Sequence, residues 1–361
     1  MSKLKVGVLG ATGMVGQRFV TLLADHPWYE VSAVAASPRS AGKTYTEAVE
    51  GRWTQPDVAI PDSVSNLVVQ NVNEIDAIAS QADFVCCALD MEKEEIHILE
   101  ENYAKKETPV ISNNSAHRWT PDVPMLLPEI NPEHVEIVPA QRKRLGTTSG
   151  FIAVKPNCSI QPYVPAFHAL ADFGPSKASV CTYQAISGNG KTFETWPEMI
   201  DNVIPYIGGE EEKSENEPHK IWGAIVKDEI VARHSPLISA QCIRVPVTDG
   251  HMAAVSVSFE QKPSSEEVLS YWDEFKSHPK AANLPSSPET FLSYIEGDDR
   301  PQTRLDRDAS DGMGITLGRL REDNLFDYKF IALSHNTVRG AAGGAVLMAE
   351  LLTKEGYIQG K

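Results

Sequence analysis

The chain has 361 residues, which is enough for about two domains that each bury their own core. Its formal net charge of −16 argues against nucleic acid or an anionic membrane as the main partner, because both are bound through patches of lysine and arginine. No apolar run approaches the roughly 20 residues that cross a bilayer. The five cysteines form no CxxC pair, and no cluster of cysteine and histidine has metal-ligand spacing. We therefore expect a cytoplasmic protein without a membrane span, a disulfide framework or a metal site.

The first half of the chain alternates short apolar runs with helical patterns. Strands are expected at 5–9, 31–36, 84–88 and 109–111. A helical pattern follows the first run to about residue 23, and an amphipathic helix is expected from 91 to about 104. This alternation predicts an α/β fold with a Rossmann-type, doubly wound parallel sheet, whose ligand lies at the carboxyl ends of the strands.

The second half of the chain has a different character. Longer runs with interleaved polar residues at 178–186, 241–247 and 253–259 predict an antiparallel sheet that is covered on one face, in a second domain of the α+β type. Ser264 and Glu267 have the spacing of a capping box that opens a helix. The stretch 337–352 is rich in glycine and alanine and predicts a single helix that packs closely on another element.

A glycine-rich turn follows the first strand. Gly10, Gly13 and Gly16 have the spacing GxxGxxG, a variant of the dinucleotide-binding fingerprint. Glycines let the backbone approach a pyrophosphate, whose charge meets the free N–H groups at a helix N-terminus. Because this turn follows a strand and opens a helix, we expect it to bind a dinucleotide.

The end of the second strand distinguishes NAD from NADP. Sites for NAD place Asp or Glu there to bind the ribose hydroxyls. This chain has Ser37, Arg39 and Ser40 instead, followed by Lys43. Small hydroxyls and a guanidinium favour a 2′-phosphate, so the sequence predicts NADP as the cofactor.

Cys158, in the segment KPNCSI at 155–160, is the candidate nucleophile. A thiolate adds to a carbonyl, and the resulting thiohemiacetal can pass a hydride to a nicotinamide and leave a thioester. A free cysteine has a pKa of about 8.5, so a neighbouring base is needed near neutral pH. His251 is the best candidate, because it shares the segment RVPVTDGH with the anion-binding Arg244. The alternative is that Cys158 is only a small buried hydrophobe.

Four segments together resemble the archaeal and fungal branch of aspartate-β-semialdehyde dehydrogenase. They are PNCS at 156–159, QAISGNG at 184–190, IPYIGGEEEK at 204–213 and RVPVTDGH at 244–251. The resemblance runs from the glycine turn to the C-terminal helix. It implies a reversible reductive dephosphorylation of β-aspartyl phosphate to aspartate semialdehyde with NADPH, in the biosynthesis of lysine, methionine and threonine.

The resemblance also implies a domain organisation. Residues 1–155 would form the NADP-binding domain, and 156–335 the catalytic and dimerisation domain. Residues 336–361 would form a C-terminal helix that returns to the first domain. The protein would act on a small-molecule substrate as a homodimer or homotetramer.

The same resemblance assigns roles to residues. Cys158 would be the nucleophile, His251 the general acid and base that activates the thiol and protonates the carbonyl oxygen, and Gln184 the group that orients the acyl-enzyme. Arg244 would bind the substrate carboxylate through its planar fork. The other predicted substrate-binding residues are Arg118 and Lys220 for phosphate, Glu217 for the amino group, and Asn114, Glu210 and Lys213. Which Glu and which Lys of 210–220 face the substrate stays open.

The cofactor contacts implied by the resemblance fall in four places. They are the turn residues Gly10, Thr12, Gly13, Met14 and Val15; Ser37, Arg39 and Ser40 for the 2′-phosphate; Ser187 and Gly188 near the nicotinamide; and Asn336 for the carboxamide.

Two related enzymes are the alternatives. N-acetyl-γ-glutamyl-phosphate reductase shares the expected fold and cysteine chemistry, but its cysteine usually lies in a Gly-Cys-Tyr-Pro context. Malonyl-CoA reductase acts on a thioester, and the presence of both Arg118 and Lys220 favours phosphate instead. A catalytically silent NADP-binding regulator is a third alternative. Ile160 departs from the small or hydroxyl residue that many relatives carry, which leaves the acyl specificity open.

Overall fold

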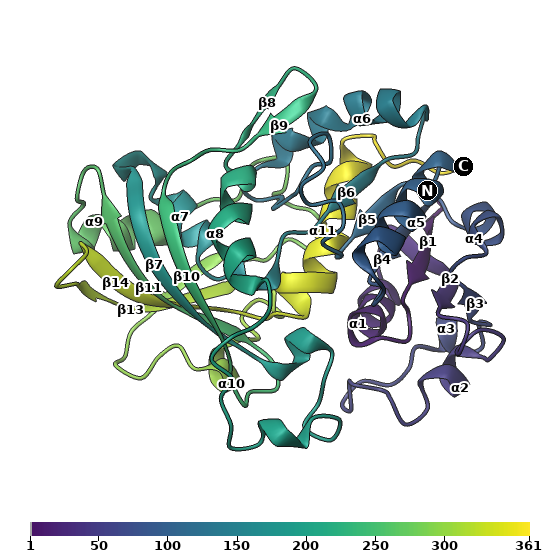
Figure 1. Cartoon of the computed structure of the whole chain (residues 1–361), viewed down its shortest axis with the longest axis horizontal. Coiled ribbons are helices and arrows are strands. Elements are labelled where there is room, and N and C mark those ends of the chain that lie inside the picture. Colours follow the sequence, from purple (N-terminus) through teal and green to yellow (C-terminus); the bar gives the residue numbers. More distant parts are fainter. Residues whose placement is uncertain (1) are drawn as a thin grey trace.

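The computed structural model describes residues 2–361, so Met1, the first residue of the predicted N-terminal domain, lies outside the described residues. Figure 1 shows two sheets side by side, with the C-terminal helix α11 between them. Among the described residues, no helix combines the length and the apolar character needed to cross a bilayer.

The N-terminal sheet is parallel and doubly wound, as predicted. Its strand order is β3-β2-β1-β4-β5-β6, so the chain leaves β1 toward one edge and later returns to build the other. The strands are β1 (Leu4–Leu9), β2 (Tyr29–Ala36), β3 (Gln70–Asn71), β4 (Phe84–Cys87), β5 (Val110–Ser112) and β6 (Ile152–Val154). The point where the order reverses, between β1 and β4, is where α/β sheets of this kind bind ligands.

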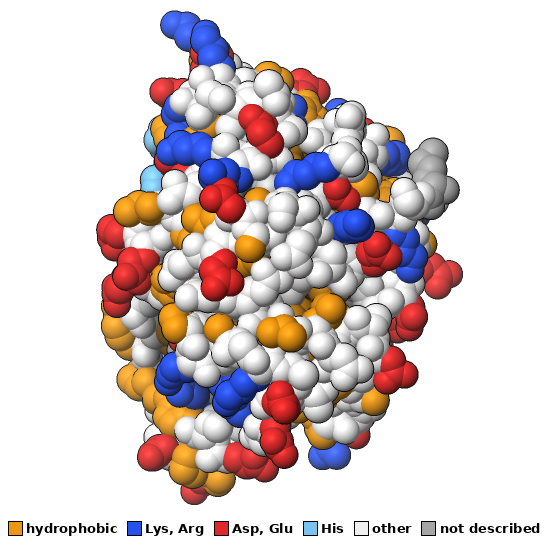
Figure 2. All heavy atoms as spheres, turned by 90° about the vertical axis from the view of Figure 1, so that its right-hand side faces the viewer, with side chains coloured by type: hydrophobic (Ala, Val, Ile, Leu, Met, Phe, Trp, Pro, Cys, Tyr) orange, Lys and Arg blue, Asp and Glu red, His pale blue; other side chains and the backbone are white. Residues whose placement is uncertain are grey.

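Helices surround this sheet. They are α1 (Met14–Leu23), α2 (Tyr45–Val49), α3 (Asp62–Ser65), α4 (Ile75–Gln81), α5 (Lys93–Lys105), the 3₁₀ helix η1 (Pro132–Ile137) and α6 (Val138–Leu145). The strands read as continuous apolar runs because both faces are covered, and β4 is buried along its whole length. On the outer face of this domain, basic and acidic side chains are interspersed (Figure 2).

The second sheet is mixed, and the prediction of an antiparallel sheet was wrong in this respect. Its strands are β10 (Leu237–Arg244), β7 (Pro175–Gln184), β11 (His251–Phe259), β14 (Tyr328–Ser334), β13 (Ile315–Glu322) and β12 (Leu292–Ile295), in that spatial order. β10 runs parallel to β7, and β12 runs parallel to β13. A long connection brings β10 back to β7 in the same direction. The polar-apolar alternation was read correctly as burial of one face, but it carries no information about strand direction.

The covered face of this sheet packs against helices. Along β11 every second residue from His251 to Phe259 is buried, and the residues between them are partly exposed. The helical elements of this part are η2 (Cys158–Ile160), α7 (Val164–Ala169), η3 (Ala171–Phe173), η4 (Ile186–Asn189), η5 (Pro197–Met199), α8 (Glu210–Ile221), α9 (Ser265–Glu274) and α10 (Thr303–Asp306). A hairpin of β8 (Ala224–Val226) and β9 (Glu229–Val231) follows α8. The predicted capping box opens α9: the backbone N–H of Glu267 donates to the Ser264 side chain, and the backbone N–H of Ser264 donates to the Glu267 carboxylate.

The predicted C-terminal helix is interrupted. A π-helical turn, η6 (Val338–Ala342), precedes α11 (Gly343–Lys354), and Ala341 within η6 has the non-helical angles φ −140° and ψ −106°. α11 belongs to the same hydrophobic core as β1, and its buried Glu350 bonds His26 Nε2 at 2.7 Å. The backbone N–H groups of Lys5 and Lys361 both donate to the carboxylate of Asp83, which holds the two ends of the described chain together.

Candidate active site

A cavity of about 440 Å³ lies between the two domains. It is lined from the first domain by Val15, Asp90, Asn113, Asn114, Ser115 and Arg118, and from the rest of the chain by Asn157, Cys158, Gln184, Ser187, Gly188, Asn189, Ile207, Gly208, Glu210, Lys213, Arg244, Asn336, Thr337, Gly340 and Ala341. The loops after β4, β5 and β6 all contribute to it. The cavity therefore opens at the carboxyl ends of these strands, where the sequence predicted a ligand.

The glycine turn has the backbone approach that a dinucleotide needs. Gly10 has a φ of +84°, and a Cβ there would overlap the carbonyl oxygen of Ala88. A Cβ at Gly16 would overlap the carbonyl oxygen of Gly10, so this glycine lets α1 lie close to β1. Gly13 is the N-cap of α1 and provides no side-chain cap. The first N–H groups of the helix, including those of Met14 and Val15, are left available to a phosphate, while the Thr12 carbonyl oxygen accepts from Gln17.

The predicted 2′-phosphate residues follow β2. Ser37 and Arg39 are exposed, whereas the side chain of Ser40 is buried. The guanidinium of Arg52 lies 3.5 Å from Ser40 Oγ. Arg52 is thus a second cation beside Ser40, which the sequence did not predict. It lies twelve residues further along the chain, and the helix α2 returns the chain to Ser40.

Cys158 is held at the start of η2 by its neighbour Asn157. The side-chain oxygen of Asn157 accepts from Ser159 N at 2.7 Å, which caps η2. The backbone N–H of Asn157 donates to Glu217 Oε2 at 2.6 Å, and its amide donates to Glu210 Oε1 at 2.9 Å. Asn157 was not predicted as a site residue, yet its three bonds orient the nucleophile.

The surroundings of Cys158 disfavour the thiolate in the free protein. Burial, and next the negative charge of Glu210, raise the pKa of Cys158 to about 11. Arg118, Arg244 and Lys213 act in the opposite direction. The resting thiol is therefore protonated at neutral pH.

His251 lies at the start of β11, behind Gly188 and fully buried. Its Nδ1 accepts the backbone N–H of Ala185 at 3.1 Å. Burial, together with the nearby Arg244 guanidinium, lowers the pKa of His251 to about 3, so the ring is neutral. A neutral ring whose Nδ1 accepts must carry its proton on Nε2. Nε2 has no partner within residues 2–361, so its N–H is free to donate a hydrogen bond. Nε2 could accept the thiol proton only in the other tautomer, in which the ring proton lies on Nδ1.

Arg244 is next to His251 in space. A Cβ at Gly188 would lie 2.9 Å from Arg244 Nη1 and 3.0 Å from His251 Nε2, so the lack of a side chain at Gly188 lets it lie close to both groups. Arg244 donates from Nη1 to the carbonyl oxygen of Ala185 at 2.7 Å, which fixes its direction. Arg244 and His251, the two residues predicted from the segment RVPVTDGH, are therefore neighbours beside Gly188.

The open question about residues 210–220 has a geometric answer. Glu210 and Lys213 line the cavity and form an ion pair, with Lys213 Nζ 2.8 Å from Glu210 Oε1. Gln184 also lines it, with its amide 3.3 Å from Glu210 Oε2. The first turn of α8 therefore faces Cys158.

Glu217 and Lys220 do not line this cavity, so the geometry does not support the predicted substrate contacts of these two residues. Glu217 accepts from Arg118 Nη1 at 2.8 Å as well as from Asn157 N. Lys220 Nζ donates to the carbonyl oxygens of Arg118 and Thr120 at 2.7 and 2.9 Å. Burial lowers the pKa of Lys220 to about 8. Both residues hold Arg118, and only Arg118 reaches the cavity.

Asn114 and Asn336 line the cavity with their amides engaged. Asn114 donates to the carbonyl oxygen of Leu89 at 2.6 Å and accepts from Leu89 N at 3.2 Å. Asn336 donates to Ser187 Oγ at 2.8 Å and accepts from Gly250 N at 2.8 Å. Asn336 thereby ties the C-terminal segment to the loop that carries Ser187 and Gly188.

Lys155 is a buried cation near the nucleophile that sequence reasoning did not single out. Its Nζ has no hydrogen-bond partner in the described part of the chain. Burial, and next the charge of Arg339, lower the pKa of Lys155 well below its usual range. Within residues 2–361, no three side chains of His, Cys, Asp or Glu are grouped so that they could hold a metal ion.

Comparison with known proteins gives consistent matches over the whole chain. A family model described as the NAD-binding domain of semialdehyde dehydrogenase matches residues 5–138, and one described as the dimerisation domain of semialdehyde dehydrogenase matches residues 167–339. Aspartate-semialdehyde dehydrogenase from Aspergillus fumigatus is 44% identical over 99% of each chain. That from Archaeoglobus fulgidus is 43% identical over 98% of this chain and 99% of its own.

Solved structures agree with these matches. The crystal structure of aspartate-semialdehyde dehydrogenase with NADP from Candida albicans has a TM-score of 0.86 and 36% identity, covering 99% of this chain and all of its own (100%). The Vibrio cholerae aspartate-semialdehyde dehydrogenase II has a TM-score of 0.74 and 25% identity, over 99% of this chain and 100% of its own.

Proposed function

The chain belongs to the aspartate-semialdehyde dehydrogenase family, and on this premise we propose that it interconverts β-aspartyl phosphate and aspartate semialdehyde with NADP through a thioacyl enzyme. The biosynthetic role would be the supply of aspartate semialdehyde for lysine, methionine and threonine. The observation that carries the proposal is that Cys158, Gln184 and Arg244 line one cavity with Val15 of the glycine turn.

NADP fits the residues of the N-terminal domain. Gly10 and Gly16 leave room where a Cβ would overlap the backbone, and the free N-terminus of α1 suits a pyrophosphate. Arg39 and Arg52 near Ser40 suit a 2′-phosphate. The relative from Candida albicans was solved with NADP, which supports the same choice. The bound cofactor would supply the hydride acceptor or donor.

In the oxidative direction, Cys158 Sγ forms a bond to the aldehyde carbon as the C=O π bond breaks, and the thiol proton ends on the carbonyl oxygen, which becomes the hydroxyl of the thiohemiacetal. His251 Nε2–H would donate a hydrogen bond to that oxygen and keep its proton. Loss of a hydride from the carbon and of the hydroxyl proton leaves a thioester. An oxygen of inorganic phosphate then attacks the thioester carbon, and the C–S bond breaks to give the acyl phosphate and the Cys158 thiolate.

The cations of the cavity suit an anionic substrate in an acidic protein. Arg244 would bind the α-carboxylate, because its guanidinium is fixed by the Ala185 carbonyl beside Gly188. Arg118 and Lys213 would bind the phosphate, and Glu210 the substrate amino group. Glu217, Lys220 and Asn157 would act as positioning residues for Arg118 and Cys158.

We further propose that residues 1–155 bind the cofactor, that 156–335 carry the catalytic and subunit contacts, and that 336–361 return to the first domain. The open face of the second sheet would join two copies of the chain. It carries partly exposed apolar side chains on neighbouring strands, among them Tyr183, Met252 and Ile331. The protein would work in the cytoplasm, where its five free cysteines stay reduced.

The test is NADP reduction with aspartate semialdehyde and inorganic phosphate, in wild type and in Cys158→Ser. We expect the serine variant to lose activity by about 1,000-fold or more, because a serine hydroxyl without an activating base is a far weaker nucleophile, while its NADP affinity stays unchanged. Cys86→Ala, at a buried cysteine of β4 outside the cavity, is the control for loss of a thiol elsewhere and should keep its activity.

Two further substrates separate the alternatives. N-acetylglutamate semialdehyde with phosphate tests for N-acetyl-γ-glutamyl-phosphate reductase activity. Malonyl-CoA with NADPH tests for malonyl-CoA reductase activity. Faster turnover of either, or activity that does not depend on phosphate, would contradict the proposal.

A further inference from the structure

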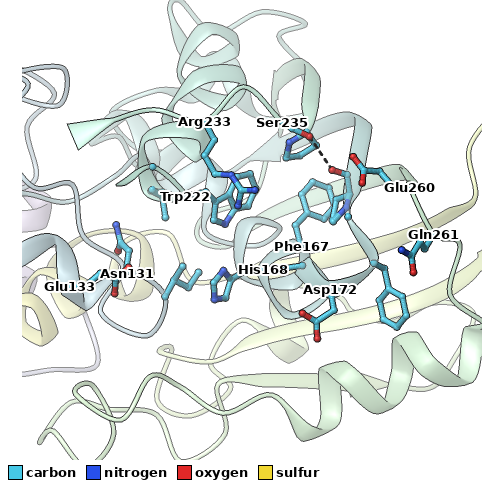
Figure 3. Close-up of a pocket in the computed structure, with 18 residues that line it drawn as sticks. Asn131, Glu133, Phe167, His168, Asp172, Trp222, Arg233, Ser235, Glu260 and Gln261 are labelled. Atoms are coloured by element: carbon cyan, nitrogen blue, oxygen red, sulfur yellow. Dashed lines mark hydrogen bonds between the residues drawn. The ribbon is translucent and has the colours of Figure 1, made fainter. Parts of the chain in front are cut away.

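Glu100 is a buried carboxyl group behind the loop that follows β5. It lies on α5 and is 0% exposed. It lines neither the active-site cavity nor a second cavity of about 440 Å³ at the C-terminal end of α8, where Figure 3 shows Phe167, Trp222 and Arg233. Any effect of Glu100 on the reaction therefore passes through its neighbours.

A chain of hydrogen bonds joins Glu100 to the active-site loop, residues 113–118. Ser112, at the end of β5, donates from Oγ to Glu100 Oε1 at 2.5 Å. The same Oγ accepts the backbone N–H of Asn114 at 3.0 Å. Cys87, at the end of β4, donates from Sγ to Asn114 Oδ1 at 3.3 Å. Asn114 lines the active-site cavity, so Glu100 is two hydrogen bonds away from a residue of that cavity.

The second carboxyl oxygen of Glu100 is shielded from solvent. Oε2 has no hydrogen-bond partner within residues 2–361. His117 Nε2 lies 3.9 Å from it and 3.1 Å from the carbonyl oxygen of His97. Burial, and next the neighbouring His97 ring, lower the pKa of His117 to about 4, so this imidazole is neutral at neutral pH and gives Glu100 no counter-charge. Ionised Glu100 would leave the lone pairs of Oε2 unsatisfied.

Arg118 is the cation whose charge acts on Glu100. Burial raises the pKa of Glu100 to about 7, whereas the bond from Ser112, the Cys87 thiol and then the charge of Arg118 act in the opposite direction. Burial also raises the pKa of Cys87 well above its usual range, so this thiol stays protonated. Glu100 thus changes its charge near neutral pH beside a guanidinium that lines the active-site cavity.

Given the proposed function, on which this inference rests, we propose that Glu100 is a positioning residue for the phosphate step. Its carboxyl group holds the active-site loop through Ser112, and in its ionised form it competes with phosphate for the positive charge of Arg118. Glu217 already pairs with Arg118 at 2.8 Å, so a second carboxylate nearby leaves less net positive charge for an anion. Phosphate should bind more tightly when Glu100 carries a proton, and by reciprocity bound phosphate should favour that protonated form.

Glu100→Gln removes the charge but keeps an oxygen that can accept from Ser112. The measurement is the KM for phosphate in NADP reduction with aspartate semialdehyde, in wild type and in the variant. At about pH 6 we expect equal KM values, and at about pH 8.5 a KM about three- to tenfold higher in wild type, because that factor corresponds to a coupling of half a pKa unit to one unit. The ratio of kcat values should stay constant. Phosphate and Lys220 also titrate in this range, but equally in both proteins, so the ratio of KM values isolates Glu100.

Glu95→Gln is the matched control, because it removes an exposed carboxylate from the same helix and should follow wild type at each pH. A purely structural role of Glu100 would raise the KM of Glu100→Gln at every pH, whereas competition for Arg118 lowers it at high pH. A ratio of KM values that does not change with pH would overturn the inference. Wild-type activity that does not depend on phosphate would instead contradict the proposed function.

Infrared spectroscopy of the wild-type protein tests the same coupling without turnover. The carbonyl band of a protonated buried carboxyl group should fade with a midpoint of about pH 7 and be absent from Glu100→Gln. Saturating sulfate, a phosphate analogue whose charge is constant over this range, should move the midpoint upward by about half a unit to one unit. A midpoint that sulfate does not move would overturn the inference even in an active enzyme.

Discussion

Charges of opposite sign around Cys158 set its reactivity. Burial disfavours the thiolate most and Glu210 adds to this effect, whereas Arg118, Arg244 and Lys213 favour the thiolate. A pKa of about 11 means that only a small fraction of the free enzyme carries a thiolate at neutral pH. An anionic substrate would neutralise some of these three cations. In the proposed mechanism the uncharged His251 Nε2–H would then still be available as a donor to the carbonyl oxygen.

Removal of the Glu210 charge should lower the pKa of Cys158. In Glu210→Gln we expect alkylation of the free enzyme by iodoacetamide to be about three- to tenfold faster at a given pH between 7 and 10, because half a pKa unit to one unit corresponds to that change in thiolate. In wild type the rate should rise about tenfold per pH unit over the same range. Glu212→Gln changes an exposed carboxylate in the same turn of α8 and should behave as wild type. An unchanged or slower rate in Glu210→Gln would show that Glu210 does not act on the thiol.

At the level of elements, α8 places several polar groups around the nucleophile. Glu210 and Lys213 line the cavity of Cys158 from the N-terminal end of the helix, and Glu217 holds Arg118 and Asn157 from its middle. Twelve residues make this helix about 18 Å long. One helix thus contributes both cavity-lining residues and a residue that positions two of its neighbours.

The π-helical turn η6 lies directly against the nucleophile. A Cβ at Gly340 would lie 2.7 Å from the Cβ of Cys158, which is closer than packing allows. We expect Gly340→Ala to displace Cys158, lower kcat by about tenfold or more and cost about 1–3 kcal/mol of stability. The measurements are steady-state kinetics and urea unfolding.

Gly343→Ala is the matched control for this variant. It adds the same methyl group one turn later, where the nearest atom is the flexible Met313 thioether sulfur at 2.7 Å. It should cost similar stability but retain kcat. Equal kcat values for the two variants would contradict the special role of Gly340.

For the whole molecule, the open face of the second sheet is the surface on which dimerisation can be tested. Ala254 lies at its centre, paired with Cys181 on β7 and with Ile331 on β14. An arginine there would be buried without a partner in a dimer, so Ala254→Arg should weaken self-association by about 100-fold or more. Sedimentation velocity at micromolar concentration measures this. Leu325→Arg, at an 83% exposed position in the turn after β13, is the control, and an unchanged dimer in Ala254→Arg would exclude this face.

Local sequence patterns were sufficient for the glycine turn and for four of the six strands of the N-terminal sheet, namely β1, β2, β4 and β5. The apolar strands alternate with helices at short range, and Gly16 is required by its contact with Gly10 in the same turn. The turn itself is therefore readable from local sequence, although the approach of Gly10 to Ala88 involves a strand that lies further along the chain. The capping box at Ser264 is equally local. The family resemblance then predicted that Cys158, Gln184, Arg244 and His251 act at one site.

Only the tertiary structure decided which residues of 210–220 line the cavity. Glu210, Lys213, Glu217 and Lys220 are spaced by three or four residues and lie on one face of α8, so helical periodicity cannot separate them. The choice depends on which turn of the helix meets Cys158. The direction of β10, the break at Ala341 and the proton on His251 Nε2 likewise depend on distant backbone groups. Sequence determined the local elements and the chemical groups, and the packing of distant segments determined which of those groups meet.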